Sequence, residues 1–296
     1  MAYIAAHPRA EKPPRLRHLA APAEGSFVIK QNWTAYSDDE HDRWNRLYAR
    51  CIGVLENRAC MEFLEMAHRL RLSNSGVPDM RELSDRIYPV TGWRVVPVAG
   101  LVPDAVFFEL LANRLFPAGA FLRSEEEFDY LKEPDIFHDI FGHVPLLANP
   151  IYADFMRAYG LGGQRATRLG QLKNLARLYW YTIEFGLVRS SAGLRIFGAG
   201  ILSSSSESRF SLESASPNRL GFDLERVLRT DYRIDDYQRT YFVIDDFDSL
   251  LRACAHDFGE VYARVKNAGD IGCGEIVESD DIVTRGTQSR VVESSI

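Results

Sequence analysis

Cysteine is scarce in this chain. Four residues, Cys51, Cys60, Cys254 and Cys273, occur among 296, and no two of them form a C-x-x-C pair. This sparse set excludes a disulfide-stapled scaffold and is typical of reduced thiols in a cytoplasmic protein. No apolar run is long enough to span a membrane. No block rich in lysine and arginine is present and the net charge is −6, so the basic footprint of a nucleic-acid-binding protein is missing.

The sequence does contain enough apolar material for a large core. Hydrophobic residues make up 46% and charged residues 26%, which is ordinary for a globular protein. A chain of this size buries about three quarters of its unfolded surface. No internal repeat or linker is visible, so we expect one domain over residues 35–268. A flexible arm is expected over residues 1–34, and a polar tail over residues 269–296.

Helical spacing of apolar residues predicts an α+β fold, predominantly helical, with small antiparallel sheets. A capping box at Ser37–Glu40 introduces the first expected helix. The glycine-rich stretch 160–163 is interpreted as a loop. Helices are expected over residues 41–55, 60–72, 79–87, 103–111, 154–159 and 171–188, and short strands over 93–98, 194–197 and 241–244.

Two of the seven histidines, His138 and His143, lie close together in the segment EPDIFHDIFGHVP, residues 133–145. On a regular helix, residues five apart differ by about 140°, so these two do not match the i, i+4 pair of a zinc protease. Convergence on one ion would place His143 at or beyond the helix end, which Gly142 and Pro145 favour. Ordinary packing of both histidines is the alternative.

Glu184 lies in the apolar helical stretch 175–188, where Arg177 is the only other charged residue. A helix that is apolar nearly all round is buried, and a carboxylate inside it needs a compensating cation. That cation can be an arginine, or a metal held together with the two histidines. Two histidines and a carboxylate form the facial triad of non-haem Fe(II) oxygen chemistry, and zinc is the competing interpretation.

Four sequence blocks carry a family resemblance. They are PVAGLVPDAVFF (97–108), EPDIFHDIFGHVPL (133–146), ARLYWYTIEFGL (176–187) and GAGILSSSSE (198–207). In this order they resemble the tetrahydropterin-dependent aromatic amino-acid hydroxylases, and most of all the bacterial members that act on phenylalanine. The resemblance covers roughly residues 35–260. It implies a monooxygenase that uses Fe(II), a tetrahydropterin and O₂ to convert L-phenylalanine to L-tyrosine, within phenylalanine breakdown, and a catalytic domain of the same helical fold.

The resemblance also implies roles for single residues at the metal and the pterin. The metal ligands correspond to His138, His143 and Glu184. A pterin is flat with polar edges, which suits an aromatic face and backbone donors. Phe107 would stack on its ring and Gly100 and Val102 would offer backbone groups. Asp139 would reach it through water, and Tyr179 would lie near both iron and pterin.

The residues implied in substrate binding surround the same centre. Arg123 would hold the amino-acid carboxylate in its planar fork, and Ser203 would assist directly or by a hydrogen bond to a histidine ligand. An apolar residue at position 234, where tyrosine-specific members have Asp, favours phenylalanine. The full implied set is Arg123, Asp135, Trp180, Ser203, Glu207 and Ile234.

Two further expectations concern assembly and alternatives. About 35 residues precede the resemblance, too few for a regulatory domain, and the tail lacks apolar heptads, so we expect a monomer. A zinc hydrolase with the same triad would need a general base, for which Asp139 or Glu207 could serve. The remaining alternative is a non-enzymatic protein built on the same scaffold.

Overall fold

The computed structural model describes residues 27–73, 76–128, 133–255 and 258–289. Its helices are α1 (Asp38–Leu55), α2 (Met61–Arg69), α3 (Met80–Thr91), α4 (Asp104–Ala112), α5 (Val144–Leu147), α6 (Pro150–Leu169), α7 (Leu172–Tyr179), α8 (Ala199–Leu202), α9 (Ser205–Glu213), α10 (Leu224–Arg229), α11 (Phe247–Ala253) and α12 (Phe258–Ala268). A 3₁₀ turn, η1 (Trp33–Ala35), and two π-helical segments, η2 (His138–His143) and η3 (Trp180–Glu184), complete the helical elements. The strands are β1 (Arg94–Val98), β2 (Leu115–Gly119), β3 (Leu187–Ser190), β4 (Gly193–Ile196), β5 (Asn218–Gly221), β6 (Thr240–Ile244) and β7 (Ile282–Thr284).

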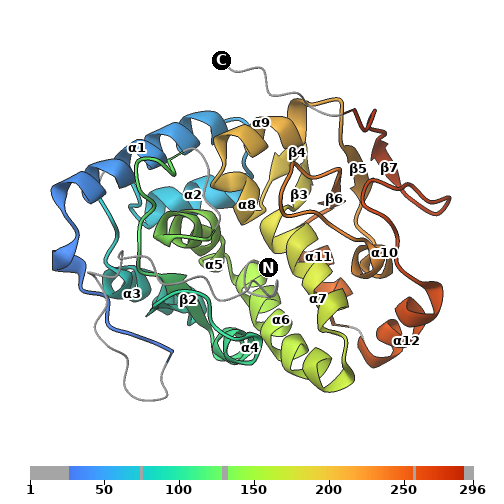
Figure 1. Ribbon diagram of the computed structural model, residues 1–296, viewed down its shortest axis with the longest axis horizontal. Coiled ribbons are helices and arrows are strands. Elements are labelled where there is room, and N and C mark those ends of the chain that lie inside the picture. The colour runs from blue at the N-terminus through green and yellow to red at the C-terminus, as the bar shows by residue number, and fades with distance from the viewer. Residues whose placement is uncertain (1–26, 74–75, 129–132, 256–257, 290–296) are drawn as a thin grey trace.

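The fold is mixed and predominantly helical, as predicted, with one small sheet on each side of the central helices α5, α6 and α7 (Figure 1). Helix α1 begins with the predicted capping box: the Ser37 hydroxyl accepts from the N–H of Glu40, whose carboxylate accepts from the N–H of Ser37. Helix α3 continues past Pro89 to Thr91. Gly92 ends it in a left-handed conformation (φ 74°) and donates its N–H to the carbonyl of Tyr88.

One sheet is parallel and the other is mixed, which corrects the expectation of antiparallel sheets. Strands β1 and β2 pair in parallel, and the second sheet has the order β4-β3-β6-β5-β7. In it, β3–β6 and β5–β6 are parallel, whereas β3–β4 and β5–β7 are antiparallel. A helix follows the first strand of two of the parallel pairs: α4 lies between β1 and β2, and α10 between β5 and β6. Such helical crossovers connect parallel strands, and the strand pattern alone did not reveal them.

The stretch 160–163 is helical, so its interpretation as a loop is wrong. It lies inside α6, which packs against α4. A Cβ atom at Gly160 would lie 2.5 Å from the backbone nitrogen of Ala112, and one at Gly163 would lie 1.9 Å from the ring of Phe108. These glycines therefore allow two helices to approach closely, and they do not break α6.

Both ends of the described chain contact the domain. Residues 1–26 lie outside the described part, but Ile29 donates its N–H to the carbonyl of Pro97 at 2.9 Å. In the expected tail, β7 extends the larger sheet. Asp280 and Arg226 form an ion pair of 2.7 Å with both side chains at least nine-tenths buried. The sequence after residue 269 does not reveal this ion pair, because such a contact leaves no periodic pattern.

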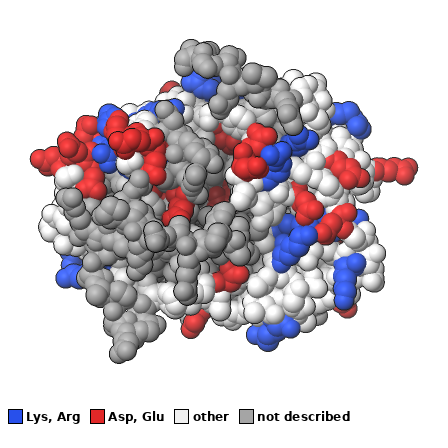
Figure 2. All heavy atoms as spheres, viewed as in Figure 1, with Lys and Arg blue, Asp and Glu red and all other residues white. Residues whose placement is uncertain are grey.

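Two features of the described part of the chain concern its surroundings: its helices and the charges on its surface. Among the described residues, no helix combines the length and apolar character that crossing a bilayer requires. Figure 2 shows both acidic and basic side chains on the face that it draws, with acidic ones gathered at the upper left.

Candidate metal centre

The π-helical winding of η2 brings His138 and His143 together. A π-helix pairs residues i and i+5, so residues five apart lie above one another. The predicted helix end at Gly142 is therefore wrong, and η2 continues directly into α5, with Pro145 in its first turn. Gly142 has another role: a Cβ atom there would lie 2.9 Å from the carbonyl oxygen of Ala199 in α8.

A second π-helical segment carries Glu184 to the same place. The N–H of Phe185 donates to the carbonyl of Trp180 at 2.8 Å, an i to i+5 hydrogen bond. The helix predicted over residues 171–188 thus changes its winding after Tyr179 and ends at Glu184. Strand β3 takes over at Leu187 and pairs with β4 and β6. The apolar run looked like one helix because a buried strand is equally apolar.

His138, His143 and Glu184 converge as predicted. The Nε2 atoms of the two histidines lie 3.3 Å apart, and Glu184 carboxylate oxygens lie 3.2 Å from His143 Nε2 and 3.6 Å from His138 Nε2. Three ligands at about 2.1 Å on one face of an ion are about 3 Å apart, so this spacing suits a metal. Among the described residues, this trio is the only group of histidine, cysteine and acidic side chains that could hold one.

The alternative partner of Glu184, an arginine, is not used. Arg177 forms ion pairs with Asp231 and Asp270 instead. Burial by itself would raise the pKa of Glu184, but the two imidazoles outweigh it and hold this pKa well below its usual range. Burial lowers the pKa of His143, which favours the neutral imidazole that a metal ligand requires.

Ser203 fixes the orientation of the His138 ring. Its Oγ lies 2.9 Å from His138 Nδ1 and 2.8 Å from the carbonyl oxygen of Ala199. The carbonyl can only accept, so the hydroxyl donates to Ala199 and accepts a hydrogen bond from the N–H at Nδ1. In the neutral ring Nε2 then carries no proton, and its lone pair is available to a metal.

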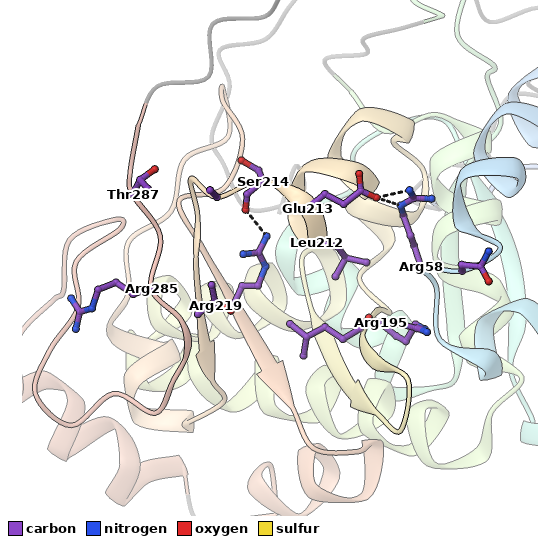
Figure 3. A pocket seen from close by; sticks show the side chains of 12 residues that line it. Arg58, Arg195, Leu212, Glu213, Ser214, Arg219, Arg285 and Thr287 are labelled. Atoms are coloured by element: carbon purple, nitrogen blue, oxygen red, sulfur yellow. Dashed lines mark hydrogen bonds and ion pairs between the residues drawn. The ribbon is translucent and has the colours of Figure 1, made fainter.

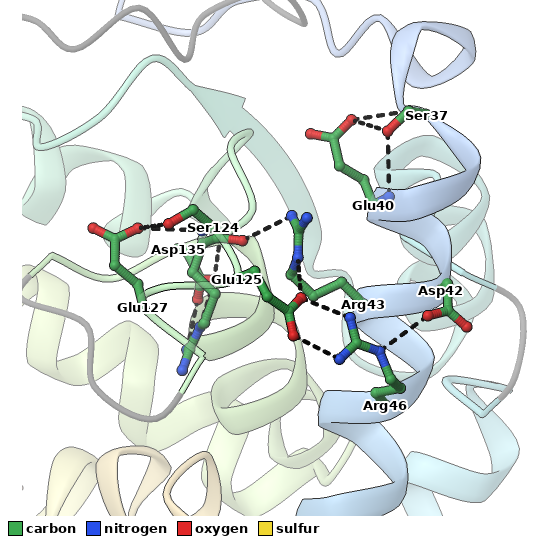
Figure 4. A network of polar contacts seen from close by, with 10 residues as sticks. Ser37, Glu40, Asp42, Arg43, Arg46, Ser124, Glu125, Glu127 and Asp135 are labelled. Atoms are coloured by element: carbon green, nitrogen blue, oxygen red, sulfur yellow. Dashed lines mark hydrogen bonds and ion pairs between the residues drawn. The ribbon is translucent and has the colours of Figure 1, made fainter.

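Arg123 is engaged by Asp135, which is completely buried. The guanidinium donates from Nε and Nη2 to the two carboxylate oxygens, each at 2.9 Å, and Asp135 also accepts from the N–H of His138. Within the described part of the chain, Nη1 makes no hydrogen bond. Arg43 of α1 binds the carbonyl of Arg123 and, together with Arg46, the carboxylate of Glu125, so α1 supports this segment (Figure 4).

Glu207 and Trp180 meet through Gln238, a residue that sequence reasoning missed because a single glutamine gives no signal. The indole N–H of Trp180 donates to Gln238 Oε1 at 2.8 Å. Glu207 accepts from the hydroxyl of Tyr241 and from the backbone N–H of Gln238. Burial raises the pKa of Glu207 to about 7. Ile234, in the same 231–239 segment, is 49% exposed.

The aromatic residues implied in pterin binding lie near His143. Gly100 and Val102 belong to the connection between β1 and α4. The Phe107 ring centroid lies 5.8 Å from that of Tyr179, which in turn lies 6.2 Å from that of His143.

Asp139 lies beside the end of β2. One of its carboxylate oxygens accepts the N–H of Gly119 at 2.7 Å, whereas the other is buried and has no hydrogen-bond partner among the described residues. Burial raises the pKa of this carboxyl to about 7. A buried oxygen of this kind requires an added partner, such as a water or a ligand.

Known proteins match this chain over most of its length. A model of the biopterin-dependent aromatic amino acid hydroxylase family matches residues 28–266. Phenylalanine-4-hydroxylase of Caulobacter vibrioides is 56% identical over 267 residues, which cover 90% of this chain and 91% of that protein. The enzyme of the same name from Ralstonia nicotianae is 53% identical, with 88% and 84% covered.

Solved structures give the same result. The crystal structure of phenylalanine hydroxylase from Chromobacterium violaceum with iron and phenylalanine bound has a TM-score of 0.84 at 50% identity, and covers 88% of this chain and 95% of that one. Its cobalt-bound structure has a TM-score of 0.89 at 48% identity, with 93% and 100% covered. Together with the triad of His138, His143 and Glu184, these matches establish that the chain belongs to the biopterin-dependent aromatic amino acid hydroxylase family.

Proposed function

We propose that this protein is a phenylalanine 4-monooxygenase, which hydroxylates L-phenylalanine to L-tyrosine with O₂ and a tetrahydropterin at a mononuclear Fe(II). The observation that carries the proposal is the convergence of His138, His143 and Glu184 within a fold that matches phenylalanine hydroxylases at a TM-score of 0.89. Two histidines and one carboxylate on one face leave the remaining metal positions open for other ligands. The related Chromobacterium violaceum enzyme has been crystallised with iron and phenylalanine.

The chain's own residues prepare this site for the metal. Iron, when bound, supplies the activation of O₂ together with the reduced pterin. Ser203 holds His138 in the tautomer whose Nε2 lone pair can bind a metal. Burial lowers the pKa of His143 and so favours its neutral form, and Glu184 supplies a carboxylate that offsets part of the metal's charge. The protein thus provides three oriented ligands without reorganisation.

The pterin and the substrate are proposed to bind on different sides of the triad. Phe107 and Tyr179, in edge-to-face contact, offer aromatic surfaces to the pterin, and the unpaired oxygen of Asp139 offers an acceptor for its polar edge. On the substrate side, Arg123 has Nη1 available for the amino-acid carboxylate. Gln238 holds the indole of Trp180, which would bound the space for the substrate ring.

We further propose that the protein acts as a monomer in the cytoplasm. The segment after residue 269 supports the first point, since β7 and the ion pair of Asp280 with Arg226 engage it within its own domain. The four cysteines support the second point, because all are free and two of them, Cys51 and Cys60, are buried.

The proposal is tested by tyrosine formation from L-phenylalanine by the purified protein. The assay supplies Fe(II), O₂ and a reduced tetrahydropterin, and omits each in turn. Protein loaded with zinc and the Glu184→Ala variant serve as controls. Tyrosine that requires iron, pterin and Glu184 together supports the proposal. Folded, iron-loaded protein that forms no tyrosine would refute it, and zinc-dependent hydrolysis would then be examined.

A further inference from the structure

A second hollow lies away from the triad and carries a concentration of arginines. Its volume is about 700 Å³. It is bounded by the C-terminal end of α9, by strands β4 and β5, and by the segment that follows β7 (Figure 3). None of the residues implied in metal, pterin or substrate binding lines it.

The lining is strongly positive although the whole chain is negative. Four arginines, Arg58, Arg195, Arg219 and Arg285, and a single acidic residue, Glu213, line the hollow, which gives a formal charge of +3. The net charge of the chain is −6. Glu213 is already bound by Arg58, as Figure 3 shows. The other three arginines make no ion pair with any residue that the structure describes.

Arg219 is the most informative of these side chains. It is 4% exposed, and its guanidinium donates to the carbonyl oxygens of Ser211 at 2.7 Å and Ser214 at 2.9 Å, at the end of α9. These neutral acceptors leave its charge uncompensated, and Nη1 has no hydrogen-bond partner in the described part of the chain.

The other buried arginines each have a counter-ion. Each of them, Arg123, Arg177 and Arg226, forms an ion pair with a carboxylate. A buried cation without a counter-ion is costly, because it loses hydration and gains no opposite charge. Within the described protein, Arg219 therefore lacks the negatively charged partner that the other three buried arginines have. An anion bound in the hollow can supply that charge.

We propose that this hollow binds a small molecule that carries two linked phosphates. Guanidinium groups match phosphate oxygens in fork-like pairs, and three uncompensated charges exceed the need of one carboxylate. The hydroxyls of Thr284 and Thr287 also line the hollow and can donate to phosphate oxygens. Leu194 and Leu212 add apolar surface that an organic group can cover. Inorganic pyrophosphate and a nucleoside diphosphate share this chemistry.

The test is calorimetric titration of the full-length, iron-loaded protein with pyrophosphate and, in a separate arm, with ADP. We expect one site per chain whose affinity falls as salt is added. Loss of one charged hydrogen-bonding partner should weaken binding about tenfold in Arg195→Ser and in Arg285→Ser. Arg219→Met should weaken it further. If ADP binds more tightly than pyrophosphate, the ligand is a nucleotide, and equal affinities indicate that the phosphates alone are recognised.

Two controls keep the result interpretable. Arg168→Ser removes an exposed arginine of α6 outside the hollow and should leave the affinity unchanged. His143→Ala removes an iron ligand, and unchanged binding there shows that the phosphates do not simply chelate the metal. The surface variants Arg195→Ser and Arg285→Ser test the site even if Arg219→Met fails to fold. The proposal would be overturned by absence of binding, by an affinity that is unchanged in both Arg195→Ser and Arg285→Ser, or by an equal affinity for citrate.

Discussion

Replacement of Ser203 by alanine should weaken metal binding without disturbing the ligands themselves. The Ser203 hydroxyl lies 2.9 Å from His138 Nδ1 and holds the ring in the tautomer that offers Nε2 to the metal. Loss of such a supporting hydrogen bond typically costs about 10- to 100-fold in metal affinity, or about 1.4 to 2.7 kcal/mol. Because both side chains are partly exposed, a water can replace the hydroxyl, so we expect the lower end, about tenfold.

The affinity can be measured with Co(II), whose visible absorption reports coordination, in competition with a chelator of known strength. Ser206→Ala is the matched control, because Ser206 lies in the same serine run, is exposed, and its hydroxyl forms a hydrogen bond with Ser204. We expect this control to bind Co(II) like the wild type. Equal affinity of Ser203→Ala and the wild type would refute the role assigned to the hydroxyl.

Two further predictions concern stability. Because burial raises the pKa of Glu207 from 4.5 to about 7, the unfolded chain loses this proton first, and the free energy of unfolding falls by up to about 3 kcal/mol between these two pH values. Glu207→Gln should remove that part of the pH dependence, measured by urea unfolding at several pH values. If the free energy of unfolding changed with pH equally in both proteins, the prediction would be contradicted. In α6, Gly163→Ala should lower the free energy of unfolding by about 1–3 kcal/mol through its clash with Phe108. The neighbouring Gly162→Ala meets nothing within 4 Å and should stabilise α6 by up to about 1 kcal/mol, so equal effects of the two substitutions would argue against the close helix contact.

The sequence predicts the chemistry of the metal centre better than its backbone. His138, His143 and Glu184 were identified as a triad, and the structure brings them together. The winding that does so was missed in both segments, because π-helices have no sequence pattern of their own and apolar spacing was compared only with a regular helix. A spacing of five, which argued against convergence on an α-helix, favours it on a π-helix.

Packing partners account for the other differences between the sequence-based predictions and the structure. The glycines at 160 and 163 indicate a loop when they are considered alone, and only the presence of Ala112 and Phe108 of α4 shows why α6 needs them. Arg123 looked like a free clamp for a carboxylate, whereas half of its fork is already committed to Asp135. Gln238 could not be singled out, since its role depends on Trp180, 58 residues away.

Parallel strand pairing escaped prediction for a related reason. Strands β3 and β6 are adjacent in the sheet but distant in the chain, and single strands carry no record of their partner or its direction. Local signals were reliable where the interaction itself is local, as for the capping box of Ser37 and Glu40 at the start of α1.

The most direct test of the central claim is the origin of the oxygen atom in the product. The protein would be supplied with Fe(II), a tetrahydropterin and L-phenylalanine under isotopically labelled O₂, and the tyrosine would be analysed by mass spectrometry. The account predicts that the new hydroxyl carries the label, and that it stays unlabelled when the water is labelled instead. Tyrosine whose hydroxyl comes from water, or no tyrosine from folded and iron-loaded protein, would contradict a monooxygenase built on His138, His143 and Glu184.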